Sequence, residues 1–300
     1  MNAPAMPSSP TAPPELPGAA GPGAAVLRWL CDPCPATAPA ELDRAGLGPV
    51  LQAAIDAKLV CLLAHRLLGG PADAGLSRPM RSVLGQFVRA NALHNRLHRG
   101  EAVRIVRVLA SRGVSVAVLN GLAYDTALYL PGGLRQFTDI DLLVDAADRD
   151  AALNVLAELG FTQPGRGAHT RRRTTGDALT PTVSIDITTG LGHTADPADV
   201  RAALARTKAE GDGGVALPVL ARADALAHAL ARLAARPRWS GLADAARLAL
   251  AAPGSSREAV AAVSEPLHAG WAVLHSHLPD LVPGPPPATG GRLAREEVAR

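Results

Sequence analysis

The chain has 300 residues, of which 48% are hydrophobic, and its 30 Lys and Arg residues against 27 Asp and Glu residues leave a formal net charge of only +3. This hydrophobic content excludes a wholly disordered chain and allows one large domain or two smaller ones. The near balance of charge argues against a protein that binds polyanions through a strongly basic surface. Because aromatic residues make up only 3% of the chain, few side chains can stack on nucleobases, and we expect no nucleic-acid partner.

The sequence shows no segment for export or for crossing a membrane. The first residues lack the charged and apolar regions of a secretory signal, and no uncharged apolar run reaches about 18 residues. Three cysteines are too few for a disulfide scaffold. We therefore expect a cytoplasmic protein with no membrane partner. The arginine-rich, lysine-poor and alanine-rich composition suggests a bacterial source with a GC-rich genome.

Changes in composition and periodicity divide the chain into five segments. Proline and small residues dominate the two ends, where no apolar periodicity predicts a helix or a strand. Leucines recur at three- and four-residue spacing on either side of a central part with short apolar runs. The expected order is a disordered proline-rich leader (1–24), a helical region ending in one long amphipathic helix (25–110), a core (111–215), a C-terminal helical region (216–278) and a flexible tail (279–300).

The short apolar runs of the central part predict buried β-strands. The runs at 114–119 and 140–144 are almost wholly apolar, whereas the run at 182–188 alternates apolar and polar residues. We expect a short helix at 122–130 and a second helix capped by Asp148. Strands and helices in this order predict an α+β fold, with a mixed-sheet core flanked by N-terminal and C-terminal helical regions.

Three aspartates carry the main chemical signal of the sequence. Asp139 and Asp141 flank Ile140, and because side chains alternate along a strand, both carboxylates point to one face. Two carboxylates at such close range repel each other, and a cation between them removes the repulsion. Asp186 lies on another apolar strand, so three carboxylates meet if the two strands are neighbours. Such oxygen ligands suit Mg²⁺, or Mn²⁺ in its place, and can hold two metal ions that activate a hydroxyl and bind a triphosphate.

A turn and an arginine lie near these aspartates in the chain. Asn120 and Gly121 end one predicted strand and open a helix, where backbone N–H groups and the helix N-terminus favour a phosphate. Arg135 precedes Asp139 on the loop that enters the next strand, and its guanidinium could pair with a phosphate. Plainer interpretations stay open: Asp139 can be a turn residue, and Gly121 an ordinary turn glycine.

These motifs resemble those of the DNA polymerase β-like nucleotidyltransferase superfamily, and more narrowly those of its uncharacterised nucleotidyltransferase family. The resemblance covers about residues 40–250 and rests on Val118-Leu-Asn-Gly121, Leu134-Arg135, Asp139-Ile-Asp-Leu-Leu-Val144, Gly160-Phe161, Ser184-Ile-Asp186 and Leu242-Ala-Asp244. It implies a nucleotidyltransferase fold. It further implies that Asp139, Asp141 and Asp186 are catalytic and bind metal, and that Asn120, Gly121 and Arg135 bind the nucleotide.

The activity that the resemblance implies is the transfer of a nucleoside monophosphate from an NTP to an acceptor hydroxyl, with release of pyrophosphate. The acceptor would be a small molecule, a peptide or a protein. The chain also departs from the family pattern, because Asn120 stands where the family usually has a lysine and Thr188 where it often has a histidine. Leu122 stands where the broader superfamily commonly has a serine. If that lysine contacts phosphate, Arg135 or the run Arg171–Arg173 would compensate for its loss.

Two other functions stay open at this point. The missing lysine fits a catalytically degenerate protein that binds a nucleotide or a partner without turnover. The second alternative is a transferase that modifies RNA, against which the modest net charge and the few aromatic residues count.

Overall fold

The computed structural model describes nine parts of the chain: residues 15–19, 23–35, 39, 47–69, 76–163, 170–175, 182–211, 216–252 and 264–284. Most of the expected leader and most of the expected tail lie outside these residues. Among the described residues, no helix is both long enough and apolar enough to cross a membrane.

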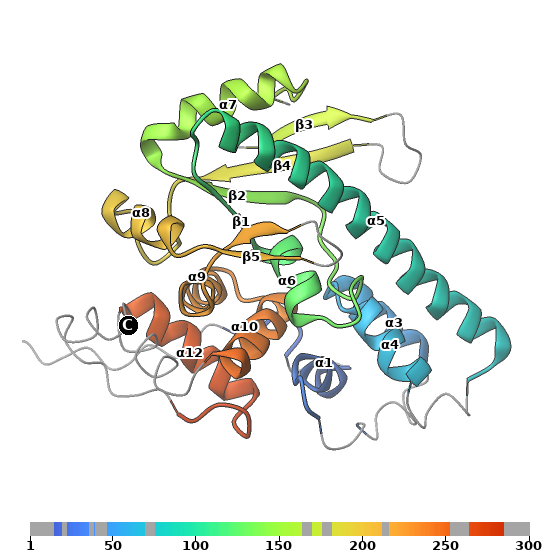
Figure 1. Cartoon of the computed structure of the whole chain (residues 1–300). Helices are drawn as coiled ribbons and strands as arrows, with labels where there is room; N and C mark the ends of the chain where they lie inside the picture. Colours follow the sequence, from blue (N-terminus) through green and yellow to red (C-terminus); the bar gives the residue numbers. More distant parts are fainter. Residues whose placement is uncertain are drawn as a thin grey trace, which may run out of the picture.

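A mixed β-sheet forms the centre of the molecule (Figure 1). Within the described residues, the sheet has the strand order β3-β4-β2-β1-β6-β5. Its strands are β1 (Val116–Leu119), β2 (Ile140–Val144), β3 (Thr170–Thr174), β4 (Thr182–Thr188), β5 (Lys208–Glu210) and β6 (Leu217–Val219). The pairs β2/β4 and β1/β6 are parallel, and the other neighbours are antiparallel. The predicted α+β class with a mixed sheet is therefore confirmed.

The strands predicted from apolar runs are present. The strands β2 and β4 have the expected bounds, and β1 begins two residues later than expected. Residues 171–173, for which the sequence predicted no strand, belong to β3 and pair antiparallel with β4. The strands β5 and β6 were not predicted, because three residues are too few to show an alternation. The strand β6 also carries the sheet beyond residue 215, where we expected the core to end.

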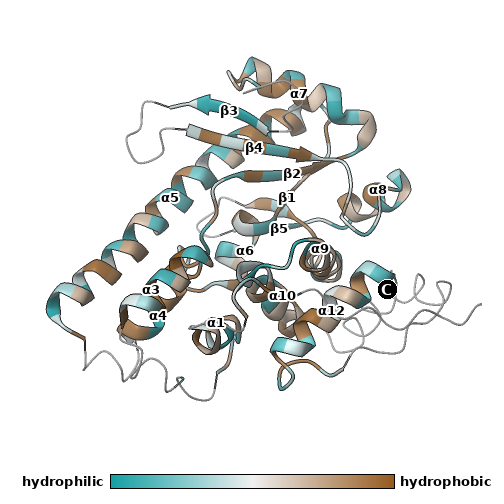
Figure 2. Ribbon diagram, turned by 180° about the vertical axis from the view of Figure 1, so that it is seen from behind, coloured by the Kyte–Doolittle hydropathy of each residue, from teal (hydrophilic) through white to brown (hydrophobic). Residues whose placement is uncertain are grey.

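Apolar and polar side chains alternate along β4, so one face of the strand packs into the core and the other faces a polar site. Val183, Ile185 and Ile187 are buried on one face. Asp186 and its polar neighbours therefore lie on the opposite face, which is only partly buried. Figure 2 shows the same contrast in colour, with β3 largely hydrophilic and β4 alternating.

Helices surround the sheet. Before β1 lie α1 (Ala24–Cys31), α3 (Leu47–Asp56), α4 (Val60–Gly69) and α5 (Arg78–Ser111). Between the strands lie α6 (Asn120–Leu128), the 3-10 turn η2 (Ala146–Asp148), α7 (Arg149–Glu158) and α8 (Pro197–Ala205). After β6 come α9 (Arg222–Ala235), α10 (Trp239–Ala251) and α12 (Glu265–His277). The predicted long helix is α5, which has 34 residues and is about 50 Å long.

The helices after β6 pack closely against one another and against the N-terminal part. In Figure 1, α9, α10 and α12 gather beyond the β1–β5 side of the sheet. A Cβ atom on Gly270 of α12 would lie 2.1 Å from the Leu230 carbonyl oxygen of α9, so only glycine permits this approach. Arg247 of α10 donates to the Cys31 carbonyl of α1 at 3.2 Å. These contacts fix α9 and α10 opposite the ends of β1, β2 and β4.

Candidate active site

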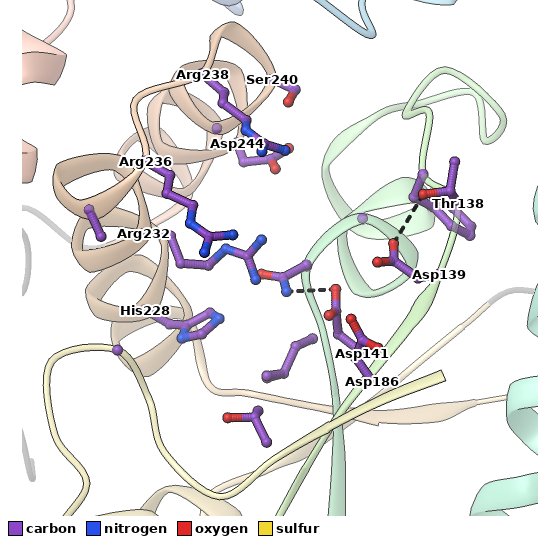
Figure 3. Close-up of a pocket in the computed structure, with 18 of the residues that line it drawn as sticks. Thr138, Asp139, Asp141, Asp186, His228, Arg232, Arg236, Arg238, Ser240 and Asp244 are labelled. Atoms are coloured by element: carbon purple, nitrogen blue, oxygen red, sulfur yellow. Dashed lines mark hydrogen bonds between the residues drawn. The ribbon is translucent and has the colours of Figure 1, made fainter. Parts of the chain in front are cut away.

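The three predicted aspartates come together on one face of the sheet. Asp141 of β2 and Asp186 of β4 are direct partners in the parallel pairing of these strands. Asp139 immediately precedes β2 and lies two residues before Asp141, so its side chain is on the same face. One carboxylate oxygen from each of the three lies within 4.8 Å of the others, and Figure 3 shows the three side chains together at one side of a cavity. The expectation that the two strands are neighbours is confirmed.

The carboxylates are arranged as ligands of a cation would be. Burial, and then the charge of Asp139, raises the pKa of Asp141 to about 6, while a hydrogen bond from Asn120 and the positive charge of Arg232 act in the opposite direction. The Oδ1 atom of Asp186 is buried and has no hydrogen-bond partner among the described residues. A buried acceptor without a donor is costly unless a cation or a donor meets it. The oxygen-only set therefore fits a hard divalent cation such as Mg²⁺ or Mn²⁺.

The turn before α6 holds Asp141 in place. Asn120 has a φ of 54°, a left-handed conformation that asparagine tolerates better than most residues. From this position its Nδ2 donates to Asp141 Oδ2 at 2.7 Å. A Cβ atom on Gly121 would lie 2.6 Å from the Cβ of Phe137, so this glycine is required by packing. Asn120 and Gly121 both line the cavity, and their contact with phosphate stays a prediction.

Arg135 also lines the cavity, but its guanidinium is already hydrogen bonded. Its Nε and Nη2 donate to the two carboxylate oxygens of Asp244, each at 2.8 Å, and its Nη1 donates to the Gln136 carbonyl. The Tyr129 hydroxyl donates to the same carboxylate at 2.7 Å. Arg135 and Asp244 are both buried, and the pair joins the loop before β2 to α10. The predicted role of Arg135 in nucleotide binding stays a prediction.

The run Arg171–Arg173 lies on β3, the strand at one edge of the sheet. Arg173 pairs with Glu101 of α5 at 2.8 Å. None of the three arginines lines the cavity that holds the aspartates. The run therefore lies at the edge of the sheet, away from the cavity, and contacts α5 through Arg173.

The cavity is large enough for a nucleotide. Its volume is about 920 Å³, near the upper end of the usual range for small-molecule sites. One wall consists of residues at the ends of β1, β2 and β4, including the three aspartates. The opposite wall comes from the end of α9, the beginning of α10 and the segment between them.

The basic residues of this second wall were not predicted from the sequence as part of the site. Arg232, Arg236 and Arg238 line the cavity opposite the aspartates (Figure 3), and Lys58 lines it as well. The spacing of Arg232 and Arg236 by four residues, in an otherwise alanine- and leucine-rich segment, was a signal that could have been noticed. That they face the aspartates depends on how α9 packs, which the sequence does not reveal.

Comparison with known proteins places the chain in a family. The family described as "uncharacterised nucleotidyltransferase" matches residues 44–276. No curated protein matches the sequence. Among solved structures, an antigenic nucleotidyltransferase-like protein from Paracoccidioides brasiliensis is similar with a TM-score of 0.47 and 17% identity, over 61% of this chain and 89% of the other. The antibiotic-resistance factor ANT(2'')-Ia is similar with a TM-score of 0.39 and 14% identity, over 64% of this chain and 97% of the other.

The family match spans the turn at Asn120, the strands β2 and β4 and all three aspartates. It extends beyond the 40–250 range of the sequence resemblance at its C-terminal end, through almost all of α12. The chain belongs to the uncharacterised nucleotidyltransferase family.

Proposed function

We propose that the protein transfers a nucleoside monophosphate from an NTP to an acceptor hydroxyl and releases pyrophosphate, in a reaction that depends on Mg²⁺. The observation that carries the proposal is the meeting of Asp139, Asp141 and Asp186, with oxygens within 4.8 Å of one another, at the wall of a cavity of about 920 Å³. Family membership supports the reaction class. The acceptor would be a small molecule, a peptide or a protein.

In this proposal Asp139, Asp141 and Asp186 hold the divalent cation. The cation, when bound, neutralises charge on the triphosphate and makes an acceptor hydroxyl more acidic. Asn120 holds Asp141 Oδ2 through its side-chain amide, which keeps that carboxylate in one orientation. In addition to holding the cation, Asp186 would accept the proton of the acceptor hydroxyl, because it is a carboxylate of the same cluster.

The residues around the aspartates orient the substrate. Asn120 and Gly121 begin α6, and backbone N–H groups at a helix N-terminus favour phosphate oxygens. Arg135 is fixed by Asp244 and so holds the loop that leads into Asp139. Little covalent chemistry is required of the protein, because positioning and charge stabilisation supply most of the rate in phosphoryl-type transfer.

The proposal is tested by titrating the purified protein with ATP, GTP, CTP and UTP, with Mg²⁺ or Mn²⁺ and with a chelator. Calorimetry measures binding, and the same samples are assayed for pyrophosphate. The test variant is Asp139→Asn/Asp141→Asn. A matched control is Glu158→Gln/Asp280→Asn, because both residues are exposed and neither lines the cavity.

Binding of one or more NTPs that requires the metal, persists in the control and vanishes in the test variant would support the proposal, as would metal-dependent release of pyrophosphate. Nucleotide binding without any pyrophosphate release, under all acceptors tried, would favour the degenerate alternative. Equal binding by the test variant and the wild type would contradict the assignment of the aspartates.

A further inference from the structure

The second wall of the cavity carries three arginines. Arg232 belongs to the last turn of α9, and Arg236 and Arg238 follow in the segment that leads into α10. All three side chains are exposed and line the cavity. Figure 3 shows them on the opposite side of the cavity from Asp139, Asp141 and Asp186, on the wall formed by α9 and the start of α10.

These arginines have no anionic partner in the part of the chain that the structure describes. None of the three guanidinium groups makes a hydrogen bond or an ion pair there, although their backbone groups do take part in hydrogen bonds. Other arginines of the same helices are paired, as Arg222 is with Glu210 at 2.8 Å. A cation at Arg232 is favoured by the negative end of the α9 dipole, but Arg236 and Arg238 lie beyond the helix and gain little from it. A bound anion would explain all three positions together.

The charges of the two walls indicate what kind of anion fits. The aspartates repel any anion that enters without a cation, whereas the arginines attract it with or without one. Arg232 is close enough to Asp141 to oppose the rise of its pKa, so the two walls act on the same space. A ligand with a single negative charge would meet one guanidinium, and a chain of phosphates carries enough charge and length to meet several.

We infer that Arg232, Arg236 and Arg238 bind the polyphosphate chain of the substrate, on the side of the cavity opposite the aspartates. The same arginines then hold the pyrophosphate product. This inference rests on the proposed function, because it takes the NTP as the ligand. It adds a phosphate site on the α9–α10 segment that neither the turn at Asn120 nor Arg135 supplies.

The test uses inorganic tripolyphosphate in the presence of a chelator, so that neither a metal nor turnover is involved. Calorimetric titrations compare the wild type with Arg232→Gln/Arg236→Gln/Arg238→Gln. The matched control is Arg78→Gln/Arg96→Gln/Arg107→Gln, which removes the same charge from exposed positions on α5 outside the cavity. Far-ultraviolet circular dichroism and thermal unfolding establish that each variant is folded.

We expect the cavity variant to bind tripolyphosphate at least roughly tenfold more weakly than the wild type, and the control to bind like the wild type. The affinity of the wild type should fall with added salt more steeply than that of the cavity variant. Asp139→Asn/Asp141→Asn should bind tripolyphosphate more tightly than the wild type under these conditions, because it removes the opposing charges. The same variant is expected to lose metal-dependent NTP binding, so its effects on the two ligands should be opposite.

Three results would overturn the inference. One is no tripolyphosphate binding by either the wild type or the aspartate variant. Another is an equal loss in the cavity and control variants. The third is binding of citrate as tight as that of tripolyphosphate, which would assign the arginines to a carboxylate ligand. Tripolyphosphate binding that depends on the arginines, together with no pyrophosphate release from any NTP, would support this anion site while the proposed function fails.

Discussion

Asp141 and Asp186 face each other as direct partners across the parallel strands β2 and β4. Partner residues on neighbouring strands point their side chains to the same face of the sheet, so the register of β2 and β4 brings these two carboxylates together. Asp139 joins them from the residue before β2. The sheet therefore assembles a cluster of negative charge that is unfavourable for the protein alone and suited to a bound cation.

Removing one of these charges should stabilise the metal-free protein. Burial and Asp139 raise the pKa of Asp141 to about 6, so the folded state holds that proton more tightly than the unfolded state. The ionised carboxylate therefore costs stability above pH 6, and the cost disappears as the pH falls below the unfolded pKa. Asp141→Asn should raise the free energy of unfolding at pH 7.5 by up to about 3 kcal/mol. Urea unfolding with a chelator measures this, and a less stable variant would contradict it.

Divalent cations should stabilise the wild type but not variants that lack one of the aspartates. A ligand that binds only the folded state stabilises it in proportion to the logarithm of its concentration. Millimolar Mg²⁺ or Mn²⁺ should raise the Tm of the wild type, and it should change the Tm of Asp141→Asn or Asp186→Asn little. Differential scanning fluorimetry with matched ionic strength measures the shifts. Equal shifts in all three proteins would place the cation elsewhere.

Replacing only one partner of the buried Arg135–Asp244 pair should lower the free energy of unfolding strongly. Asp244→Asn leaves a buried guanidinium without a counter-charge, and we expect a loss of about 3–5 kcal/mol in the free energy of unfolding. Replacing both partners, as in Arg135→Met/Asp244→Leu, should recover part of this loss. A double-mutant cycle from urea unfolding measures the coupling. Strictly additive losses would show that the pair contributes nothing as a pair.

The left-handed backbone conformation of Asn120 should make glycine more stable than alanine at this position. Both Asn120→Gly and Asn120→Ala lose the hydrogen bond to Asp141, but glycine adopts a φ of 54° without strain. Asn120→Ala should therefore be less stable than Asn120→Gly by about 1 kcal/mol. Denaturant unfolding of the two variants measures the difference. Equal stabilities would show that the backbone there relaxes.

His228 should make the stability of the protein depend on pH. Its imidazole is buried in the cavity wall, and burial together with the charge of Arg232 lowers its pKa from 6.5 to about 4. As the pH falls, the unfolded state therefore takes up the proton before the folded state does. Protonation of His228 costs the folded state no stability above pH 6.5, and this cost grows as the pH falls toward 4. The limit of this loss is about 3 kcal/mol.

The comparison that isolates this effect is the wild type against His228→Leu. The free energy of unfolding of the wild type should fall more steeply than that of the variant between pH 7 and pH 4.5. Because both proteins carry the same carboxylates, the difference between the two slopes belongs to the histidine. Parallel pH profiles would contradict the assignment.

Local sequence patterns predicted β1, β2 and β4 but not β3, β5 and β6, and they could not predict how distant elements pack together. Apolar runs were enough to place β2 and β4 with their aspartates. Their adjacency could only be assumed, because pairing between distant strands leaves no local signal. Arg135 was assigned to phosphate, but its partner Asp244 comes from a helix 109 residues later. In the same way, the place of Arg232 in the cavity wall could not be predicted, because it depends on how α9 packs opposite the sheet.

The central claim is that the aspartates of β2 and β4 hold the cation of a nucleotidyl-transfer site. The most direct test is a crystal structure of the protein with Mn²⁺ and a non-hydrolysable NTP, using the anomalous signal of manganese to locate the metal. The account predicts an anomalous peak in contact with oxygens of Asp139, Asp141 and Asp186, with the phosphates of the nucleotide between that peak and α9. Manganese or nucleotide bound away from these carboxylates would contradict it.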